Sequence, residues 1–166
     1  MSEQRAFYLS IGSNIHPESN LPKAIQRLRE FGRIPAISNA WESHAEGSEG
    51  PNYLNAALLF MAITQTDDLQ PMVIRPIEAD LGRVRRSDKN APRTIDIDIM
   101  IADGEPLNVN RWAYPFVIVT MSELLPDFIH PLTHKRLAEA AAEACAKTWI
   151  VQRPEILKMS VSTLKA

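Results

Sequence analysis

Residues 81–100 read LGRVRRSDKNAPRTIDIDIM, and the second part of this stretch alternates in a way that predicts a β-strand. Successive side chains of an extended chain point to opposite sides, so the isoleucines at 95, 97, 99 and 101 should share one face. Asp96 and Asp98 fall on the other face, with Thr94 and Met100. Aspartate is uncommon in strands, so two neighbouring carboxylates on one face need an explanation.

Four arginines precede these acids in the sequence: Arg83, Arg85, Arg86 and Arg93. Neighbouring carboxylates repel each other unless a proton or a cation neutralises one of them. Carboxylates suit hard divalent cations such as Mg²⁺, and guanidinium groups suit phosphate oxygens. The combination predicts a metal-assisted phosphoryl-transfer site. The alternative is a salt-bridge network of the acids with Arg83 and Arg93 on a solvated sheet face, without metal.

The composition of the whole chain predicts one ordinary soluble domain covering residues 1–166. The 166 residues are 45% hydrophobic and 23% charged, which is typical of a globular protein. The net charge of −2 argues against general polyanion binding, so we expect no nucleic-acid partner. The single cysteine, Cys145, excludes an internal disulfide and fits a reducing cytoplasm. With no signal segment and no long apolar run, we expect a cytoplasmic protein without a membrane partner.

The spacing of apolar residues, with glycines and prolines at the boundaries, predicts six elements in the first two thirds of the chain. They are a strand at 6–11, a helix at 20–31, a strand at 34–42, a strand at 53–63, a helix at 66–81 that Pro76 should kink, and the strand at 94–101. This order predicts an α+β fold of the ferredoxin-like βαββαβ type, an antiparallel sheet with helices packed on one face.

The last third of the chain is less regular. Asp103-Gly104 predicts a tight turn, and a C-terminal helix is expected at about 132–147. Residues 107–112 suit either a short strand or a turn, while the sequence leaves open the type of residues 116–125 and of the tail.

With these residues in view, the chain resembles the 6-hydroxymethyl-7,8-dihydropterin pyrophosphokinases of folate synthesis. Four pieces carry the resemblance: IGSN at 11–14, PNYLNAA at 51–57, IEADLGRVR at 77–85 and PRTIDIDIM at 92–100. Each piece is modest alone, but the four occur in order over most of the chain. The resemblance implies a ferredoxin-like fold and transfer of the β,γ-pyrophosphoryl group of ATP to the hydroxymethyl group of the pterin.

The resemblance also implies the parts of the site that hold metal and ATP. Asp96 and Asp98 would hold two Mg²⁺ ions for an in-line attack on the β-phosphorus, and Arg83 and Arg93 would contact the phosphates during transfer. The residues implied in ATP binding are Glu78, Arg85 and Arg111. For Glu78 the alternative is an ordinary solvated glutamate on a helix.

The pterin would lie against the third predicted strand. Asn55 can donate to and accept from the edge of the heterocycle, and an aromatic ring suits its face. The resemblance places Tyr53 and Phe116 on either side of the ring and the backbone of Ser43 against it. The alternative for Tyr53 is a core residue. Residues 12–14 correspond to a mobile loop in relatives, and the alternative for them is a simple turn. Other folate-pathway enzymes are possible partners.

The sequence departs from the family pattern where relatives hold ATP. Tyr114-Pro115-Phe116 closes up a segment that in relatives carries a histidine and an arginine for ATP. The proline-rich loop after the second strand has also changed. The first hypothesis is therefore an active pterin pyrophosphokinase with altered ATP contacts. The alternatives are a transferase acting on a different pterin, and a catalytically weak paralogue that binds pterin or nucleotide.

Overall fold

The computed structural model describes residues 3–45, 47, 49–84 and 92–157. Within these residues seven strands form one antiparallel sheet in the order β6-β5-β1-β4-β3-β7, with β2 also paired to β4. The strands are β1 (Arg5–Ser13), β2 (Arg33–Ile37), β3 (Ala40–Ser43), β4 (Tyr53–Ala62), β5 (Asp96–Ala102), β6 (Glu105–Pro106) and β7 (Ile150–Arg153). The helices are α1 (Pro17–Leu28), α2 (Thr66–Leu69), the π-helical η1 (Gln70–Ile74), α3 (Arg75–Asp80), the 3-10 helix η2 (Val109–Ala113), α4 (Pro115–Leu124) and α5 (Leu137–Lys147).

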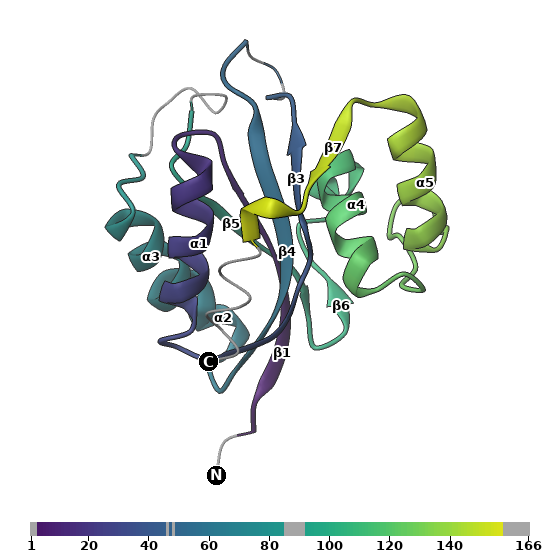
Figure 1. Cartoon of the computed structure of the whole chain (residues 1–166). Coiled ribbons are helices and arrows are strands. Elements are labelled where there is room, and N and C mark those ends of the chain that lie inside the picture. Colours follow the sequence, from purple (N-terminus) through teal and green to yellow (C-terminus); the bar gives the residue numbers. More distant parts are fainter. Residues whose placement is uncertain (1–2, 46, 48, 85–91, 158–166) are drawn as a thin grey trace.

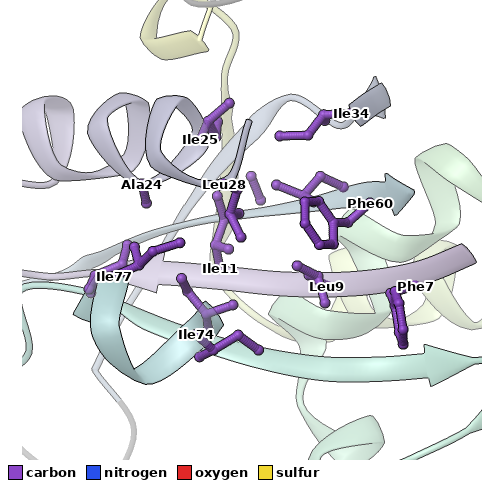
Figure 2. Packing of buried hydrophobic residues seen from close by; sticks show 14 of the residues in the cluster. Phe7, Leu9, Ile11, Ala24, Ile25, Leu28, Ile34, Phe60, Ile74 and Ile77 are labelled. Atoms are coloured by element: carbon purple, nitrogen blue, oxygen red, sulfur yellow. The ribbon is translucent and has the colours of Figure 1, made fainter. Parts of the chain in front are cut away.

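The main core lies between the sheet and the first group of helices, α1 to α3 (Figure 1). Phe7, Leu9 and Ile11 of β1 pack in the same buried cluster as Ile25 and Leu28 of α1 (Figure 2). Burying one such side chain fully contributes roughly 1.5–3 kcal/mol, so this layer accounts for much of the apolar stabilisation. Because side chains alternate along β1, the residues between these three face the opposite side of the sheet.

A second helical layer covers that opposite side. Helix α4 contacts β4, and α5 packs on α4. Val117, Val119 and Met121 are all buried, because α4 lies between the sheet and α5. The predicted α+β fold and its C-terminal helix, α5, are confirmed. Helix α4 was not predicted, and with α5 it forms a layer on the face of the sheet that the prediction left without helices.

The strand predicted at 34–42 is divided into β2 and β3, which both pair with β4. The break falls at Ser38, whose hydroxyl accepts a hydrogen bond from the Ala57 amide at 2.8 Å while the Ser38 amide donates to the Ala57 carbonyl at 2.8 Å. A side chain therefore replaces a backbone group in the sheet, which turns the chain at this point.

A β-bulge in β5 changes the face of one predicted core residue. In the register with β1, Tyr8 pairs with Ile101 and Leu9 with Ile99, so Met100 is an extra residue. Ile95, Ile97 and Ile99 lie in the main core as predicted. Ile101 instead packs with the residues under α4, so its predicted position on the same face is wrong.

Several predicted boundaries shift. Helix α1 begins at Pro17 rather than at residue 20, because proline fits the first turn of a helix. The predicted kink near Pro76 takes the form of η1, a π-helical turn preceding the proline that lacks an amide hydrogen. Helix α5 begins at Leu137 rather than 132, residues 107–112 mostly form η2, and the tail contains β7. Among the described helices, none has the length and apolar character needed to cross a membrane.

Candidate active site

A cavity of about 300 Å³ opens at one end of the sheet, on the face opposite the main core. Its walls come from β1, β3, β4, β5 and the segment that joins η2 to α4. The lining residues are Ser10, Gly12, Ser43, His44, Ala45, Tyr53, Asn55, Arg93, Asp96, Asp98, Arg111, Tyr114 and Phe116. The volume suits a small ligand such as a heterocycle. The cavity has a charged end formed around β5 and a less polar end formed around β3 and β4.

Asp96 lies at the centre of the charged end, surrounded by arginines. Its Oδ1 accepts a hydrogen bond from Arg83 Nη1 at 3.0 Å, and its Oδ2 accepts one from Arg93 Nη1 at 2.9 Å. Arg111 Nη2 lies 3.6 Å from the same Oδ2. The side chain of Asp96 is only 13% exposed, so water screens these ion pairs weakly.

Asp98 is less well compensated than Asp96. Arg111 Nε lies 2.9 Å from Asp98 Oδ2 and favours the charged form of the carboxyl. Burial of the carboxyl, together with the negative charge of Asp96, nevertheless raises the pKa of Asp98 to about 6. The salt-bridge network considered from the sequence is therefore present in part: Asp96 pairs with Arg83 and Arg93, whereas Asp98 pairs with Arg111. The network is largely buried, and it leaves Asp98 short of positive charge.

Glu78 supports this charged end from below. Glu78 is 2% exposed, so the alternative of a solvated helix glutamate is wrong. Its Oε2 accepts hydrogen bonds from Arg83 Nη1 and, at 3.1 Å, from the Ile97 amide. Gly82 has φ of +86° and lets the chain turn at the end of α3, where the Arg83 amide donates to the Glu78 carbonyl at 3.0 Å. Glu78 thus holds Arg83 in place next to Asp96. A direct contact between Glu78 and the nucleotide stays a prediction.

Asn14 clamps Arg93 at the backbone. The Arg93 amide donates to Asn14 Oδ1 at 2.8 Å, and the Asn14 amide donates to the Arg93 carbonyl at 3.1 Å. Asn14 Nδ2 also donates to the Pro51 carbonyl at 3.2 Å, so it joins two cavity-forming segments. The sequence pointed to a turn at 12–14, but Gly12 and Ser13 continue β1. The family motif was the one signal that could have drawn attention to Asn14.

The less polar end of the cavity is organised by Asn55. Its Nδ2 donates to the Trp41 carbonyl at 3.0 Å and to Ser43 Oγ at 2.9 Å, so both amide hydrogens are used. The carbonyl oxygen Oδ1 lies beside Gly12, where an added Cβ would come within 3.1 Å of it. Glycine at this position keeps Oδ1 accessible as an acceptor, and Ser43 acts as a partner of Asn55.

Aromatic side chains complete this end. Tyr114 and Phe116 stack with ring centroids 5.4 Å apart and an interplanar angle of 12°. The guanidinium carbon of Arg111 lies 5.6 Å from the Tyr114 centroid and 5.9 Å from that of Phe116, in cation-π range. Tyr53 lines the cavity half-buried rather than belonging to the core, and burial raises the pKa of its hydroxyl. Tyr114 was not predicted as a site residue.

The structure brings most of the predicted site residues to one place. Every predicted residue lines the cavity except Arg83 and Glu78, which support it, and Arg85, which lies outside the described residues. Ser10, Gly12, His44, Ala45 and Tyr114 also line it without having been predicted as site residues. For Ser10 and Gly12 the cause is register, since they pair with Asp98 and Asp96 across β1 and β5.

Comparison with known proteins identifies this arrangement. Residues 8–137 match the family model described as 7,8-dihydro-6-hydroxymethylpterin-pyrophosphokinase. The chain belongs to this family. The family inferred from the sequence is thereby confirmed, and with it the pyrophosphokinase class of enzyme.

Among the described residues, Asp96 and Asp98 belong to no group of three or more metal-ligating side chains.

Individual relatives agree with the family model. The chain is 34% identical over 150 residues to a 2-amino-4-hydroxy-6-hydroxymethyldihydropteridine pyrophosphokinase of Aquifex aeolicus, covering 84% of this chain and 92% of that protein. It is 29% identical over 156 residues to a pyrophosphokinase of the same description from a Synechocystis species, covering 86% and 78% respectively. Both relatives are matched over most of their length, so the pyrophosphokinase relationship extends over most of this chain.

Solved structures share the fold. A Plasmodium falciparum chain described as HPPK-DHPS aligns with a TM-score of 0.64 and 10% sequence identity over 89% of this chain. A second structure of that protein, the A437G variant, aligns with a TM-score of 0.67. The present chain spans less than half the length of these solved chains, 43% and 46%. The likeness therefore concerns the fold of one part of a longer protein.

Proposed function

We propose that this protein transfers the β,γ-pyrophosphoryl group of ATP to the hydroxymethyl group of 6-hydroxymethyl-7,8-dihydropterin in folate synthesis. A bond forms between the pterin hydroxyl oxygen and the β-phosphorus, the bond from that phosphorus to the α–β bridging oxygen breaks, and AMP leaves while the hydroxyl proton is released. One observation carries the proposal: a single cavity joins an amide-and-aromatic end to an end with two carboxylates and arginines. Membership in the pyrophosphokinase family supports the same reaction.

The less polar end would hold and orient the pterin. Asn55 Oδ1 would accept a hydrogen bond from the edge of the heterocycle, since both hydrogens of its amide are already used within the protein. Tyr53 and Phe116 would pack against the two faces of the ring. Such a fit excludes water from the ring and directs one edge of it toward β5. Ser43 would act mainly by holding Asn55 in place.

At the charged end the arginines would bind the phosphates. Arg93 and Arg111 line the cavity, and each carries a planar fork of donors that matches phosphate oxygens. Arg83 is the most buried of the three, with a side chain 9% exposed, and its contacts with Glu78 and Asp96 orient it. Arg85 and Glu78 remain proposed contributors to ATP binding. The role of each arginine is to stabilise charge that moves onto the phosphate oxygens during transfer.

The carboxylate pair fits Mg²⁺, and we propose that Asp96 and Asp98 hold two such ions together with ATP. The fit rests on the donor set and on charge: both are oxygen ligands, and the raised pKa of Asp98 reflects burial beside another carboxylate. Proteins usually bind Mg²⁺ through one or two carboxylates plus substrate phosphates, as this pair would allow. When bound, Mg²⁺ would neutralise phosphate charge and polarise the phosphoryl group.

A second candidate function is favoured by the short connection between Arg111 and Phe116. Only residues 112–115 separate them, and α4 begins at Pro115. The histidine and the arginine that hold ATP in relatives are missing from this segment, so other residues would have to supply their contacts. A transferase with a different pterin substrate, or a weak paralogue that binds pterin or nucleotide, would also fit this cavity.

Calorimetric titration distinguishes these candidates. The purified protein is titrated with a nonhydrolysable ATP analogue and Mg²⁺, with and without 6-hydroxymethylpterin, and AMP formation is then measured with the reduced substrate. Nucleotide binding that depends on Mg²⁺ and tightens pterin binding supports the kinase. Asp96→Asn should abolish AMP formation, whereas Asp127→Asn, at an exposed surface ion pair, serves as the matched control. Pterin binding without nucleotide binding would refute the kinase and leave the binding paralogue.

The proposal extends to the surroundings of the enzyme. A cytoplasmic location is consistent with folate synthesis and stays a proposal, as does the organisation of residues 1–166 as one domain. Association with another folate-pathway enzyme is also proposed. It is supported by the chain described as HPPK-DHPS, in which this fold is part of a longer protein.

A further inference from the structure

The C-terminal strand β7 lies next to the substrate cavity but outside the part of the chain that matches the family model, residues 8–137. It forms the edge of the sheet and pairs with β3, with Ser43 opposite Ile150 (Figure 1). Ser43, His44 and Ala45, at and after the end of β3, line the pterin end of the cavity. The backbone pairing therefore ties this wall of the cavity to the C-terminal strand.

An aromatic contact strengthens this connection. The rings of His44 and Trp149 stack with centroids 4.4 Å apart and an interplanar angle of 17°. Trp149 directly precedes β7 and remains 46% exposed, so it is not needed to fill the core. The stack on His44 therefore links the segment before β7 to the lining of the cavity.

A chain of polar contacts also joins β7 to the connection between β3 and β4. Arg153 of β7 bonds to Glu42 Oε1, and Glu42 Oε2 accepts from Asn52 Nδ2 at 2.8 Å. Asn52 Oδ1 lies 3.0 Å from His44 Nδ1, and His44 stacks on Trp149. These contacts begin at Trp149 and end at Arg153, both in the C-terminal segment. They hold the connection from β3 to β4 at both of its ends, at His44 and at Asn52.

We propose that Trp149 is a positioning residue for the pterin, holding His44 as the rim of the cavity at its pterin end. The inference rests on the proposed function. Without the Trp149 ring, the exposed His44 side chain would keep only its contact with Asn52 of those described above, and it could swing out and open this end of the cavity. The charged end is built on β5, α3 and η2. None of the contacts described above joins Trp149 to these three elements. Loss of Trp149 should therefore weaken pterin binding and leave phosphate chemistry intact.

The test compares three variants of the full-length protein. Trp149→Ala removes the stack, Trp149→Phe restores an aromatic face, and Val151→Ala, at an exposed apolar residue of β7, is the matched control. Steady-state kinetics give KM for the pterin, KM for ATP and kcat, and calorimetry gives the dissociation constant for 6-hydroxymethylpterin. Circular dichroism and thermal unfolding report whether each variant is folded.

An aromatic stack is worth a factor of about two to ten in an equilibrium constant, so Trp149→Ala should raise the pterin KM and dissociation constant by roughly that factor. The KM for ATP and kcat should stay within about twofold, a split that a general structural defect would not produce. Trp149→Phe should recover most of the loss, and Val151→Ala should behave like the unaltered protein.

Unchanged pterin affinity in a folded Trp149→Ala variant would overturn the inference, and so would an equal fall of kcat. If Trp149→Ala does not fold, Trp149→Phe and His44→Ala replace it. The proposal is supported if His44→Ala lowers the affinity for pterin and Trp149→Phe retains it. Unchanged pterin affinity in His44→Ala overturns the proposal. Unaltered protein that neither binds pterin nor forms AMP refutes the proposed function itself, and the role of Trp149 falls with it.

Discussion

Replacing Asp98 with asparagine should make the ligand-free protein more stable near neutral pH. Burial, and then the charge of Asp96, raises the pKa of this carboxyl from 3.8 to about 6. Between these two values the folded protein binds more protons than the unfolded chain, so the free energy of unfolding falls as the pH rises. Above about pH 6 the full penalty of a charged Asp98 is present, and an asparagine does not incur it.

The size of the effect follows from the two pKa values. At about 1.4 kcal/mol for each pH unit between them, the penalty reaches roughly 3 kcal/mol. Asparagine loses the charge attraction to Arg111, which is already included in this net value. We therefore expect Asp98→Asn to gain about 1–3 kcal/mol, and about 2–4 °C in Tm per kcal/mol for a chain of this length.

The assay is urea unfolding in the presence of a chelator, at several values between about pH 4 and about pH 8. The unaltered protein should lose stability between about pH 4 and about pH 6, and Asp98→Asn should show a flatter profile. Asp127→Asn is the control because that carboxylate is 81% exposed. The same Asp98→Asn protein should have lost Mg²⁺-dependent turnover, so a more stable protein would be an inactive one.

A different outcome would refute the reasoning. If Asp98→Asn is less stable than the unaltered protein at about pH 7, the Arg111 ion pair outweighs burial, and the carboxylate pair is not short of positive charge. A pH profile that runs parallel to that of the unaltered protein would likewise show that another group causes the slope.

The remaining predictions concern the arginines and their supports. Arg93→Ala should lower kcat by roughly a hundredfold or more while changing pterin affinity much less; equal losses in both would make Arg93 an anchor for the substrate. Asn14→Ala should cost about 1–3 kcal/mol in urea unfolding because it frees the Arg93 amide and the Pro51 carbonyl, and Asn14→Asp, which keeps the acceptor, should fall between; identical values for the two variants would contradict this. Glu78→Gln should lower both stability, by about 1–3 kcal/mol, and kcat, since a neutral amide replaces the buried partner of Arg83; unchanged melting would contradict it.

Local patterns in the sequence were enough for the main outline of the fold. Alternating isoleucines predicted β5, and apolar spacing predicted α1, β4 and the helical stretch before Gly82. The segments that were missed depend on contacts far along the chain. Strand β7 is short and carries no clear alternation, and it exists because β3 offers an unpaired edge. The break at Ser38 and the bulge at Met100 likewise depend on the partner strand.

The candidate site, like the fold, was predictable from local patterns only in part. The residue types and family pieces pointed to the acids, the arginines and the side chains that we propose to face the pterin. They did not identify His44 or Asn14, because each acquires its place through a partner distant in sequence. Tyr114 was also missed, although its stacking partner Phe116 is only two residues away. Cross-strand register brought Ser10 and Gly12 opposite the acids, and no local pattern specifies that register.

The sequence by itself determined which chemical groups this protein has for its reaction: two carboxylates on one strand face, several arginines, and an amide near aromatic rings. Only the tertiary structure decided how these groups are paired and charged. It buried Glu78 under Arg83, surrounded Asp96 with arginines and left Asp98 with a raised pKa. Burial and the distance between charges set these properties, and both arise from packing between segments that are far apart in the chain.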